Sequence, residues 1–175
     1  AAFNRENHII KKGIALMPVK FGISFNLPTL NQAGALVHVY TDGSVHLNHG
    51  GTEMGQGLYI KIAQVVASTF EIDVDHIKIS ATNTGKVPNT SATAASSGSD
   101  LNGMAAHDAA QQIKARMTKV AADHFEVDEG EIEFRNNHIY AGNQGIPFSE
   151  LAKLTWENRV SLSATGFYST PKIAW

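Results

Sequence analysis

Apolar and polar residues follow one another in a pattern that divides the chain into short strands and amphipathic helices. Two apolar segments, residues 36–40 and 45–48, flank an Asp-Gly pair at 42–43, and this pattern predicts a β-hairpin. Residues 13–25 are rich in β-branched and aromatic side chains, so we expect a first strand there. The polar residues 1–12 precede that strand and can form a disordered lead-in.

Helical spacing governs much of the chain after the hairpin. Apolar residues four apart predict one helix from about residue 57 to 71 and a long helix that starts near residue 100. The other predicted elements are a strand at 77–80, a hairpin formed by 132–135 and 138–140, a helix at 148–157 capped by Ser149, and a strand at 160–168. These elements together predict an α+β fold with mixed or antiparallel sheets and about three helices packed on them.

A glycine-rich loop at residues 49–57 carries the strongest functional signal. Four glycines occur in eight positions beside one amide side chain, Gln56, and the first predicted helix follows at once. Glycine suits a backbone that bends sharply or approaches a ligand, and a helix N-terminus offers unpaired N–H groups. The loop can therefore hold an anionic or hydrogen-bonding cofactor, to which Gln56 would donate; a tight strand-to-helix connector is the alternative.

A second loop, residues 82–99, consists mostly of small residues and leads into the long helix. Loops of this length inside a compact domain are usually functional or disordered. Ser97, Ser99 and Asp100 are candidates for capping the helix that follows. Since both loops end at helix N-termini, we expect the two termini to converge on one polyanionic ligand.

The common nucleotide motifs do not fit the glycine-rich loop. A P-loop requires a lysine and a Ser or Thr after its last glycine, where this chain has Leu58 and Tyr59. A dinucleotide fingerprint requires a third glycine at the position that Ile60 occupies. The sequence therefore disfavours ordinary ATP or NAD binding.

Composition narrows the classes further. An apolar content of 43% with 17% charged residues is typical of a globular domain. A net charge of −2 does not indicate binding to nucleic acid or to an anionic membrane. Neither a membrane span nor a signal peptide is recognisable, so a cytoplasmic location is expected. Because the sequence has no cysteine, any redox metal here needs other ligands, such as those carried by a cofactor.

The histidines and the loop carboxylate give no catalytic constellation. A two-residue turn would place His38 opposite Leu47, with His46 on the other face of the hairpin, and a three- or four-residue loop would change that pairing. We expect neither a histidine metal site nor a catalytic residue in this chain. Glu53, the only carboxylate of the glycine-rich loop, is expected to be solvated.

Several motifs in one order resemble a known family. They occupy residues 20–25, 30–35, 39–44, 49–57, 87–91, 93–96 and 160–168. In these motifs the chain resembles the molybdenum domain of the xanthine dehydrogenases. The resemblance covers nearly the whole chain and is weakest over residues 1–12 and 126–148.

The resemblance implies roles for particular residues. It implies contacts with the molybdopterin cofactor for Gly55, Gln56, Gly57, Ala94, Ala95 and Ser96. It also implies that Ala94, Ala95, Phe25 and Asn26 lie at the purine substrate, with Phe25 meeting the ring edge-on. Asn26 stands where mammalian-type enzymes carry a threonine, and Gly98 stands where a cofactor-binding serine is common.

By the same resemblance, residues 1–175 are an internal segment of the molybdopterin-binding domain of an enzyme that converts hypoxanthine to xanthine and urate. Iron–sulfur clusters, FAD and NAD would lie on other subunits or domains. The family's base glutamate has no matching position here, so the isolated segment is expected to be inactive. The alternatives are a related molybdenum hydroxylase acting on an aldehyde or N-heterocycle, a non-catalytic module for a phosphorylated ligand, and a structural domain.

Overall fold

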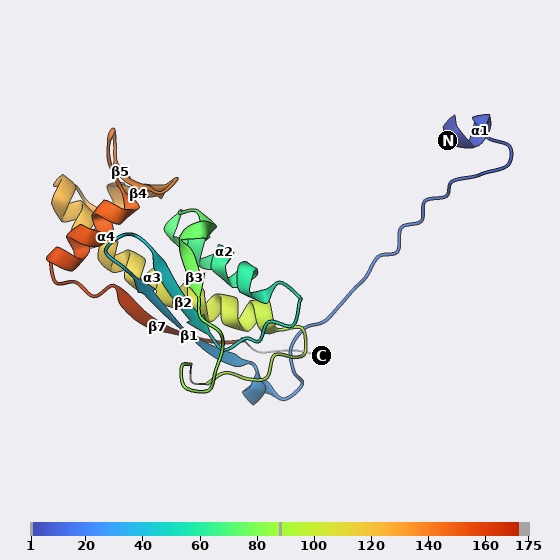
Figure 1. Cartoon of the computed structure of the whole chain (residues 1–175), viewed down its shortest axis with the longest axis horizontal. Helices are drawn as coiled ribbons and strands as arrows, with labels where there is room; N and C mark the ends of the chain where they lie inside the picture. The colour runs from blue at the N-terminus through green and yellow to red at the C-terminus, as the bar shows by residue number, and fades with distance from the viewer. Residues whose placement is uncertain (1, 88, 172–175) are drawn as a thin grey trace.

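The computed structural model describes residues 2–87 and 89–171. Its body is a layer of helices on a four-stranded mixed sheet, with a smaller three-stranded sheet at one end (Figure 1). This arrangement confirms the predicted α+β class. Pro88, which belongs to the motif at residues 87–91, and the last residues of the chain, 172–175, lie outside the described residues. No helix in the described part has the length and apolar character needed to cross a bilayer.

The large sheet has the strand order β3-β2-β1-β7. Its strands are β1 (Gln32–Val39), β2 (Val45–His49), β3 (Ile77–Ile79) and β7 (Ser163–Ser169). β1 pairs antiparallel with both β2 and β7, whereas β2 and β3 are parallel. A parallel pair needs a crossover, and α2 (Leu58–Phe70) provides it.

The β1–β2 hairpin is confirmed, but its predicted register is wrong. Tyr40 donates its N–H to Ser44 O at 2.8 Å, so the loop contains three residues rather than two. In this register His38 lies opposite His46, on the same face of the sheet. His46 is hydrogen-bonded to the hydroxyl of Ser80.

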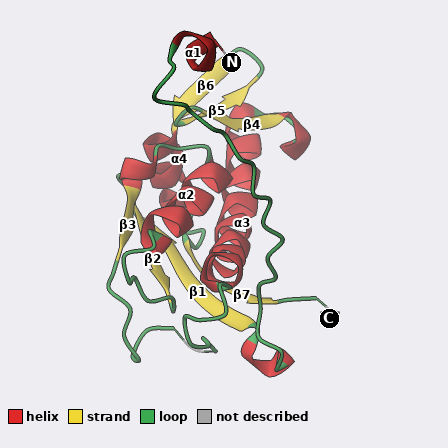
Figure 2. Ribbon diagram, turned by 90° about the vertical axis from the view of Figure 1, so that its right-hand side faces the viewer, coloured by secondary structure: helices red, strands yellow, loops and turns green. Residues whose placement is uncertain are grey.

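One face of the large sheet is covered by α2 and by α3 (Gly98–Phe125), as Figure 2 shows. Alternate residues of β1 are buried against these helices, which is the period expected of a half-buried strand. The predicted spacing of the long helix is borne out, since Ala105, Ala109, Ile113 and Met117 are all fully buried. Small residues on α3 let the helix lie close to the sheet.

Gly166 shows how close that approach is. A Cβ added to Gly166 would lie 2.0 Å from Ala105 O and 2.6 Å from Ala109 N, which are both backbone atoms of α3. Because backbone cannot turn aside as a flexible side chain can, only glycine fits at this point of β7. The contact fixes the position of α3, and therefore of its N-terminus, relative to β1 and β7.

The small sheet contains β4 (Ile132–Arg135), β5 (His138–Ala141) and β6 (Gln144–Pro147), and it packs beside α4 (Phe148–Glu157). The β4–β5 hairpin and α4 were predicted, and β6 was not. The N-cap of α4 is Pro147, so the prediction that Ser149 caps this helix is wrong.

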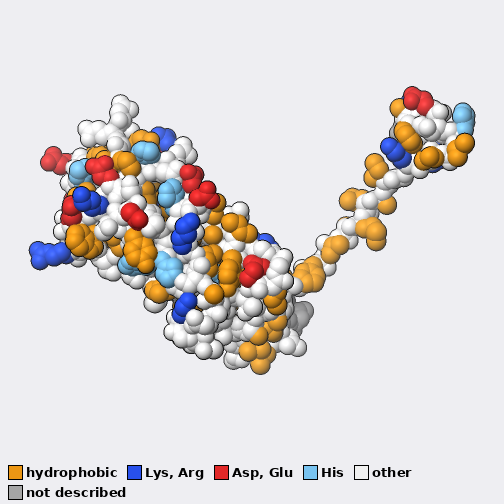
Figure 3. All heavy atoms as spheres, in the orientation of Figure 1, with side chains coloured by type: hydrophobic (Ala, Val, Ile, Leu, Met, Phe, Trp, Pro, Cys, Tyr) orange, Lys and Arg blue, Asp and Glu red, His pale blue; other side chains and the backbone are white. Residues whose placement is uncertain are grey.

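The N-terminal part of the chain differs most from the prediction. The chain begins with a short helix, α1 (Ala2–Glu6). The strand predicted over residues 13–25 is absent, and this part of the chain is an extended arm without strand pairing. The arm carries exposed apolar side chains, of which Ile14 is 102% and Leu16 90% exposed. Figure 3 shows these hydrophobic side chains strung along the arm, away from the body of the molecule.

Candidate functional site

The glycine-rich loop and the small-residue loop meet at one end of the sheet. They border an open cavity of about 490 Å³ between the N-terminal ends of α2 and α3. Thr52 N–H donates to the side-chain oxygen Oγ1 of Thr93 at 2.8 Å, which ties the two loops together. The loops lie 41 residues apart in sequence at this bond, so the fold builds the cavity from distant segments.

The structure brings together four of the residues predicted to contact a cofactor. Gln56, Ala94, Ala95 and Ser96 all line the cavity. Gly55 and Gly57 do not line it, but they shape the loop beside it. Their φ angles of +94° and +74° lie in the left-handed region that favours glycine.

Phe25 and Asn26, the residues predicted to lie at the substrate, do not line this cavity. They follow Ser24, whose N–H donates to Ala95 O at 3.1 Å. The start of their loop is therefore held directly at the bend that borders the cavity.

The N-terminus of α2 is capped from within the loop by Glu53. One carboxylate oxygen accepts N–H bonds from Gly55 at 2.9 Å and Gly57 at 3.0 Å, and the other accepts from Tyr59 at 3.0 Å. These N–H bonds, that of Tyr59 above all, lower the pKa of Glu53 below its ordinary value of 4.5. The prediction that Glu53 is merely solvated is therefore wrong, and the N–H groups of Gly57 and Tyr59, which were expected to be free, are occupied.

The amide of Gln56 is partly used by its own loop. Its oxygen accepts from Met54 N–H at 2.6 Å, and its nitrogen donates to Thr52 O at 2.9 Å. An amide nitrogen carries two hydrogens, so one donor remains for another partner. The two local bonds fix the direction in which that donor points.

The N-terminus of α3 has the opposite character from that of α2. Ser97 occupies the N-cap position without a side-chain cap; instead its hydroxyl donates to Ala94 O at 3.1 Å. Among the described residues, no acceptor is bonded to the N–H groups of Ala95, Ser96, Gly98 and Ser99. Ala95 and Ser96 also have φ angles of +51° and +53°, an unusual conformation for residues with side chains.

A bend with several unpaired N–H donors at a helix N-terminus suits an anionic group that accepts hydrogen bonds. Lys61 also lines the cavity, which adds a positive charge. We did not identify Lys61 from the sequence, although its place one turn after Gly57 puts it on the same side of α2 as the loop. The residues present therefore fit a ligand that carries an anionic group and further hydrogen-bond acceptors.

A buried histidine, His49, is hydrogen-bonded to the backbone at the start of the glycine-rich loop. His49 is 1% exposed, and its Nδ1 accepts the N–H of Gly51 at 3.1 Å. Burial lowers the pKa of His49 to about 4, although nearby Glu53 opposes the shift. The ring packs edge-on against Tyr59 at 5.1 Å, and Tyr59 in turn donates to the hydroxyl of Thr82 at 3.2 Å.

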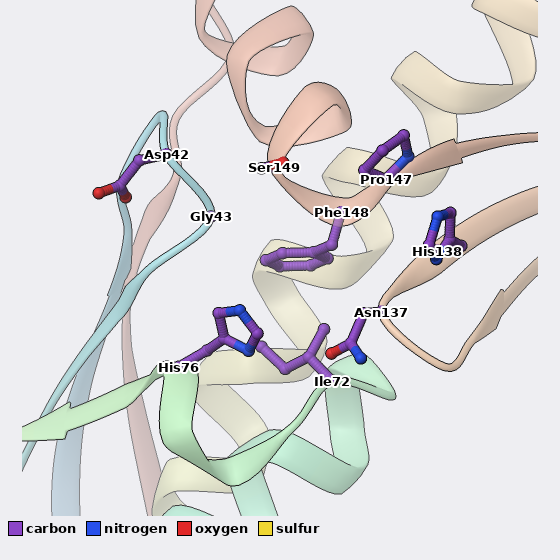
Figure 4. Close-up of a pocket in the computed structure, with 9 residues that line it drawn as sticks. All are labelled: Asp42, Gly43, Ile72, His76, Asn137, His138, Pro147, Phe148 and Ser149. Carbon is purple, nitrogen blue, oxygen red and sulfur yellow. The ribbon is translucent and has the colours of Figure 1, made fainter.

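A second cavity, of about 250 Å³, lies at the opposite end, where α4 and the small sheet meet the β1–β2 hairpin (Figure 4). Its polar groups are largely engaged locally: Asn137 is bonded to Asp73, and Asp42 accepts from Ser44. No group of three His, Cys, Asp or Glu side chains suited to a metal ion occurs among residues 2–87 and 89–171. The cavity between the two loops is therefore the better candidate site.

Comparisons with known proteins identify the family of the chain. Residues 1–175 match the family model described as the molybdopterin cofactor-binding domain. The chain is 49% identical over 173 residues to a xanthine dehydrogenase of Dictyostelium discoideum and 51% identical over 171 residues to one of Oryza sativa subsp. japonica. The two matches cover 99% and 98% of this chain, respectively, but only 11% of the length of each relative.

Solved structures show the same fold. A CO dehydrogenase from Oligotropha carboxidovorans matches with a TM-score of 0.73 and 28% identity, over 79% of this chain and 18% of that one. Quinoline 2-oxidoreductase from Pseudomonas putida 86 matches with a TM-score of 0.73 and 21% identity, over 79% of this chain and 19% of that one. The resemblance drawn from the sequence motifs is confirmed, and the chain belongs to the molybdopterin cofactor-binding domain family.

Proposed function

We propose that the cavity between the two loops holds part of the molybdopterin cofactor in a full-length protein that oxidises purines, from hypoxanthine to xanthine and urate. The observation that carries the proposal is the convergence of Gln56 with the bend at Ala94–Ala95–Ser96 on one cavity. The identity of about half to xanthine dehydrogenases supports the choice of purines as substrates.

Each loop contributes a different kind of contact in this proposal. The N–H groups of Ala95, Ser96, Gly98 and Ser99 bind acceptor atoms of the pterin and its phosphate, with Lys61 adding positive charge. Gln56 donates its remaining N–H without changing the charge of the site. When bound, the cofactor supplies the redox centre at which the substrate carbon is hydroxylated.

Gly55 and Gly57 contribute by shape. Their left-handed backbone lets Glu53 fold back over the N-terminus of α2, which keeps that terminus closed. The open terminus of α3 then becomes the place where an anionic group binds. The carboxylate of Glu53 repels an anion from the α2 side and so favours a single orientation of the ligand.

The purine would lie on the side of the bend where Phe25 and Asn26 are held. Phe25 is half-buried and offers an aromatic ring to a flat substrate, and Asn26 offers hydrogen-bonding groups. Ala94 and Ala95 have small side chains, so a planar ring can approach their backbone closely. No base is assigned to this segment, which is why we expect it to be inactive by itself.

The remainder of the full-length protein is the partner that this proposal requires. The relatives are about ninefold longer than the segment they share with this chain, so the exposed apolar arm at residues 9–23 would be covered by another part of the same polypeptide. We assign the iron–sulfur clusters, FAD and NAD to those other parts, and purine metabolism in the cytoplasm to the whole enzyme.

Replacing Gln56 tests the proposed site. In the full-length protein, Gln56→Ala should lower molybdenum content and purine turnover at least several-fold, because it removes the aimed donor and both local bonds. Gln144→Ala is the matched control, since Gln144 lies on the exposed strand β6 of the distant small sheet. Wild-type molybdenum content and turnover in Gln56→Ala would contradict the proposal.

The same preparation distinguishes the alternatives. Molybdenum with turnover of aldehydes or N-heterocycles but not of purines would contradict purines as the substrate class and point to a related hydroxylase. A wild-type protein without molybdenum or pterin would overturn the cofactor assignment altogether.

A further inference from the structure

Asn31 is a fully buried amide, 1% exposed, that makes two hydrogen bonds to the backbone of one residue. Its side-chain oxygen accepts the N–H of Phe25 at 2.9 Å, and its side-chain nitrogen donates to Phe25 O at 2.9 Å. This pair of bonds imitates the pairing of a neighbouring strand. It therefore fixes both the position and the direction of the Phe25 peptide.

We call this pair of bonds between Asn31 and Phe25 the clamp. The backbone of Asn31 is itself held by hydrogen bonds. Asn31 ends the 3-10 helix η1 (Pro28–Leu30) and directly precedes β1. Its own backbone N–H donates to Pro28 O at 3.0 Å, and its carbonyl accepts the N–H of Thr170 at 3.1 Å, just beyond β7. The side chain of Asn31 thus transmits the position of the central strands to a loop that has no strand pairing of its own.

Phe25 is also tied to the bend at the cavity. The preceding residue, Ser24, has a φ angle of +93° and donates its N–H to Ala95 O at 3.1 Å. Ala95 itself has a positive φ. Two residues in a conformation unfavourable for side chains meet at this bond, and such a geometry persists only where its surroundings hold it in place. The clamp by Asn31 acts on Phe25, one residue after Ser24, and so supports the Ser24 side of this bond. The bend at Ala95 is held separately, since both the N–H and the hydroxyl of Ser97 donate to Ala94 O.

We propose that Asn31 is a positioning residue: it sets Phe25 beside the Ala95 bend and thereby controls how a planar substrate is oriented, without taking part in cofactor retention. This inference rests on the proposed function of the cavity and of Phe25. Loss of the clamp leaves the N–H and C=O of Phe25 without partners and frees the loop from residue 24 to residue 30. The α3 N-terminus and the Gln56 loop keep all their own bonds.

The test is a pair of variants in the full-length protein. Asn31→Ala removes both bonds, and Asn31→Asp keeps the size and the acceptor but loses the donor. The matched control is Asn137→Ala, because Asn137 makes a comparable two-bond contact with Asp73 at the opposite end of the molecule. Molybdenum and pterin content, KM and kcat for a purine and for a small aldehyde, and calorimetric binding of xanthine to the molybdenum-depleted protein are measured for each.

For both Asn31 variants we expect the KM for the purine and the Kd of xanthine to rise about tenfold. Molybdenum and pterin content and the KM for the small aldehyde should stay near wild type, and Asn137→Ala should change none of these quantities. An Asn31 variant with wild-type purine binding, or one that loses cofactor in parallel, would overturn the inference. Failure of the wild-type protein to contain molybdenum or to bind xanthine would instead defeat the proposed function itself.

Discussion

Thr52 donates its backbone N–H to Oγ1 of Thr93 at 2.8 Å, and this bond joins the two loops that border the candidate cofactor cavity. The bond needs a side-chain acceptor on one loop and a backbone donor on the other. It therefore fixes the distance between Gln56 and the Ala94–Ala95–Ser96 bend, on which the proposed binding mode depends.

Thr93→Val should weaken cofactor retention. Valine has nearly the same shape but no acceptor, so the exposed Thr52 N–H loses its protein partner at a net cost of about 0.5–1.5 kcal/mol. We expect molybdenum content in the full-length protein to fall several-fold at limiting cofactor. Thr165→Val, on the exposed part of β7, is the control and should keep its molybdenum. Full retention in Thr93→Val would show that the bond does not hold the loops.

Glu53→Gln should loosen the start of α2. Because the folded-state pKa of Glu53 is lowered, its carboxylate stabilises the loop above the ordinary pKa of 4.5, and this contribution is lost as pH falls through the lowered value. At neutral pH, hydrogen exchange at Gly55, Gly57 and Tyr59 should become several-fold faster in the variant. The difference from wild type should shrink in acid, and a difference that does not change with pH would contradict the ionised cap.

His49 should make stability depend on pH in a different window. Its pKa is about 4 when folded and 6.5 ordinarily, so the unfolded chain takes up a proton first as pH falls. Stability is therefore full above pH 6.5 and declines toward pH 4, by about 3 kcal/mol at most. His49→Asn keeps an acceptor for Gly51 but does not titrate in this range. Thermal unfolding between pH 7 and 4.5 should show a shallower decline in this variant; an unchanged slope would refute a neutral, buried His49.

Gly166→Ala should destabilise the fold by at least about 1–3 kcal/mol, because the new methyl group would meet the backbone of α3 at Ala105 and Ala109. The expected result is a lower melting temperature and a lower soluble yield. Gly130→Ala is the control, since a Cβ at Gly130 would meet nothing within 4 Å. Equal melting temperatures for the two variants would mean that α3 can move away from β7 at little cost.

Local patterns in the sequence predicted most elements of the body. The spacing of Ala105, Ala109 and Ile113 reported the buried face of α3, because helix periodicity and burial coincide there. The same reasoning failed for the arm at residues 9–23, because it predicted a strand where the structure has none. An apolar run indicates that a segment becomes buried, but it does not say whether its covering surface lies in the same stretch of chain.

The candidate site was predictable as two loops but not in its detailed bonding. Gln56 and the bend at Ala94–Ala95–Ser96 were identified, and the structure brings them to one cavity. The cap by Glu53 was missed because it depends on how the loop folds back, which the left-handed angles of Gly55 and Gly57 decide. The contact of Asn31 with Phe25 gave no signal, since a lone asparagine before a strand has many other uses.

The proposed function requires that the two loops face a common pterin. A crystal structure of the full-length protein, with the molybdenum located by its anomalous scattering, tests it most directly. We expect pterin density between Gln56 and the Ala94–Ala95–Ser96 bend, with the metal beside it. A molybdenum peak and pterin bound elsewhere, with this cavity filled by other side chains of the same polypeptide, would contradict it.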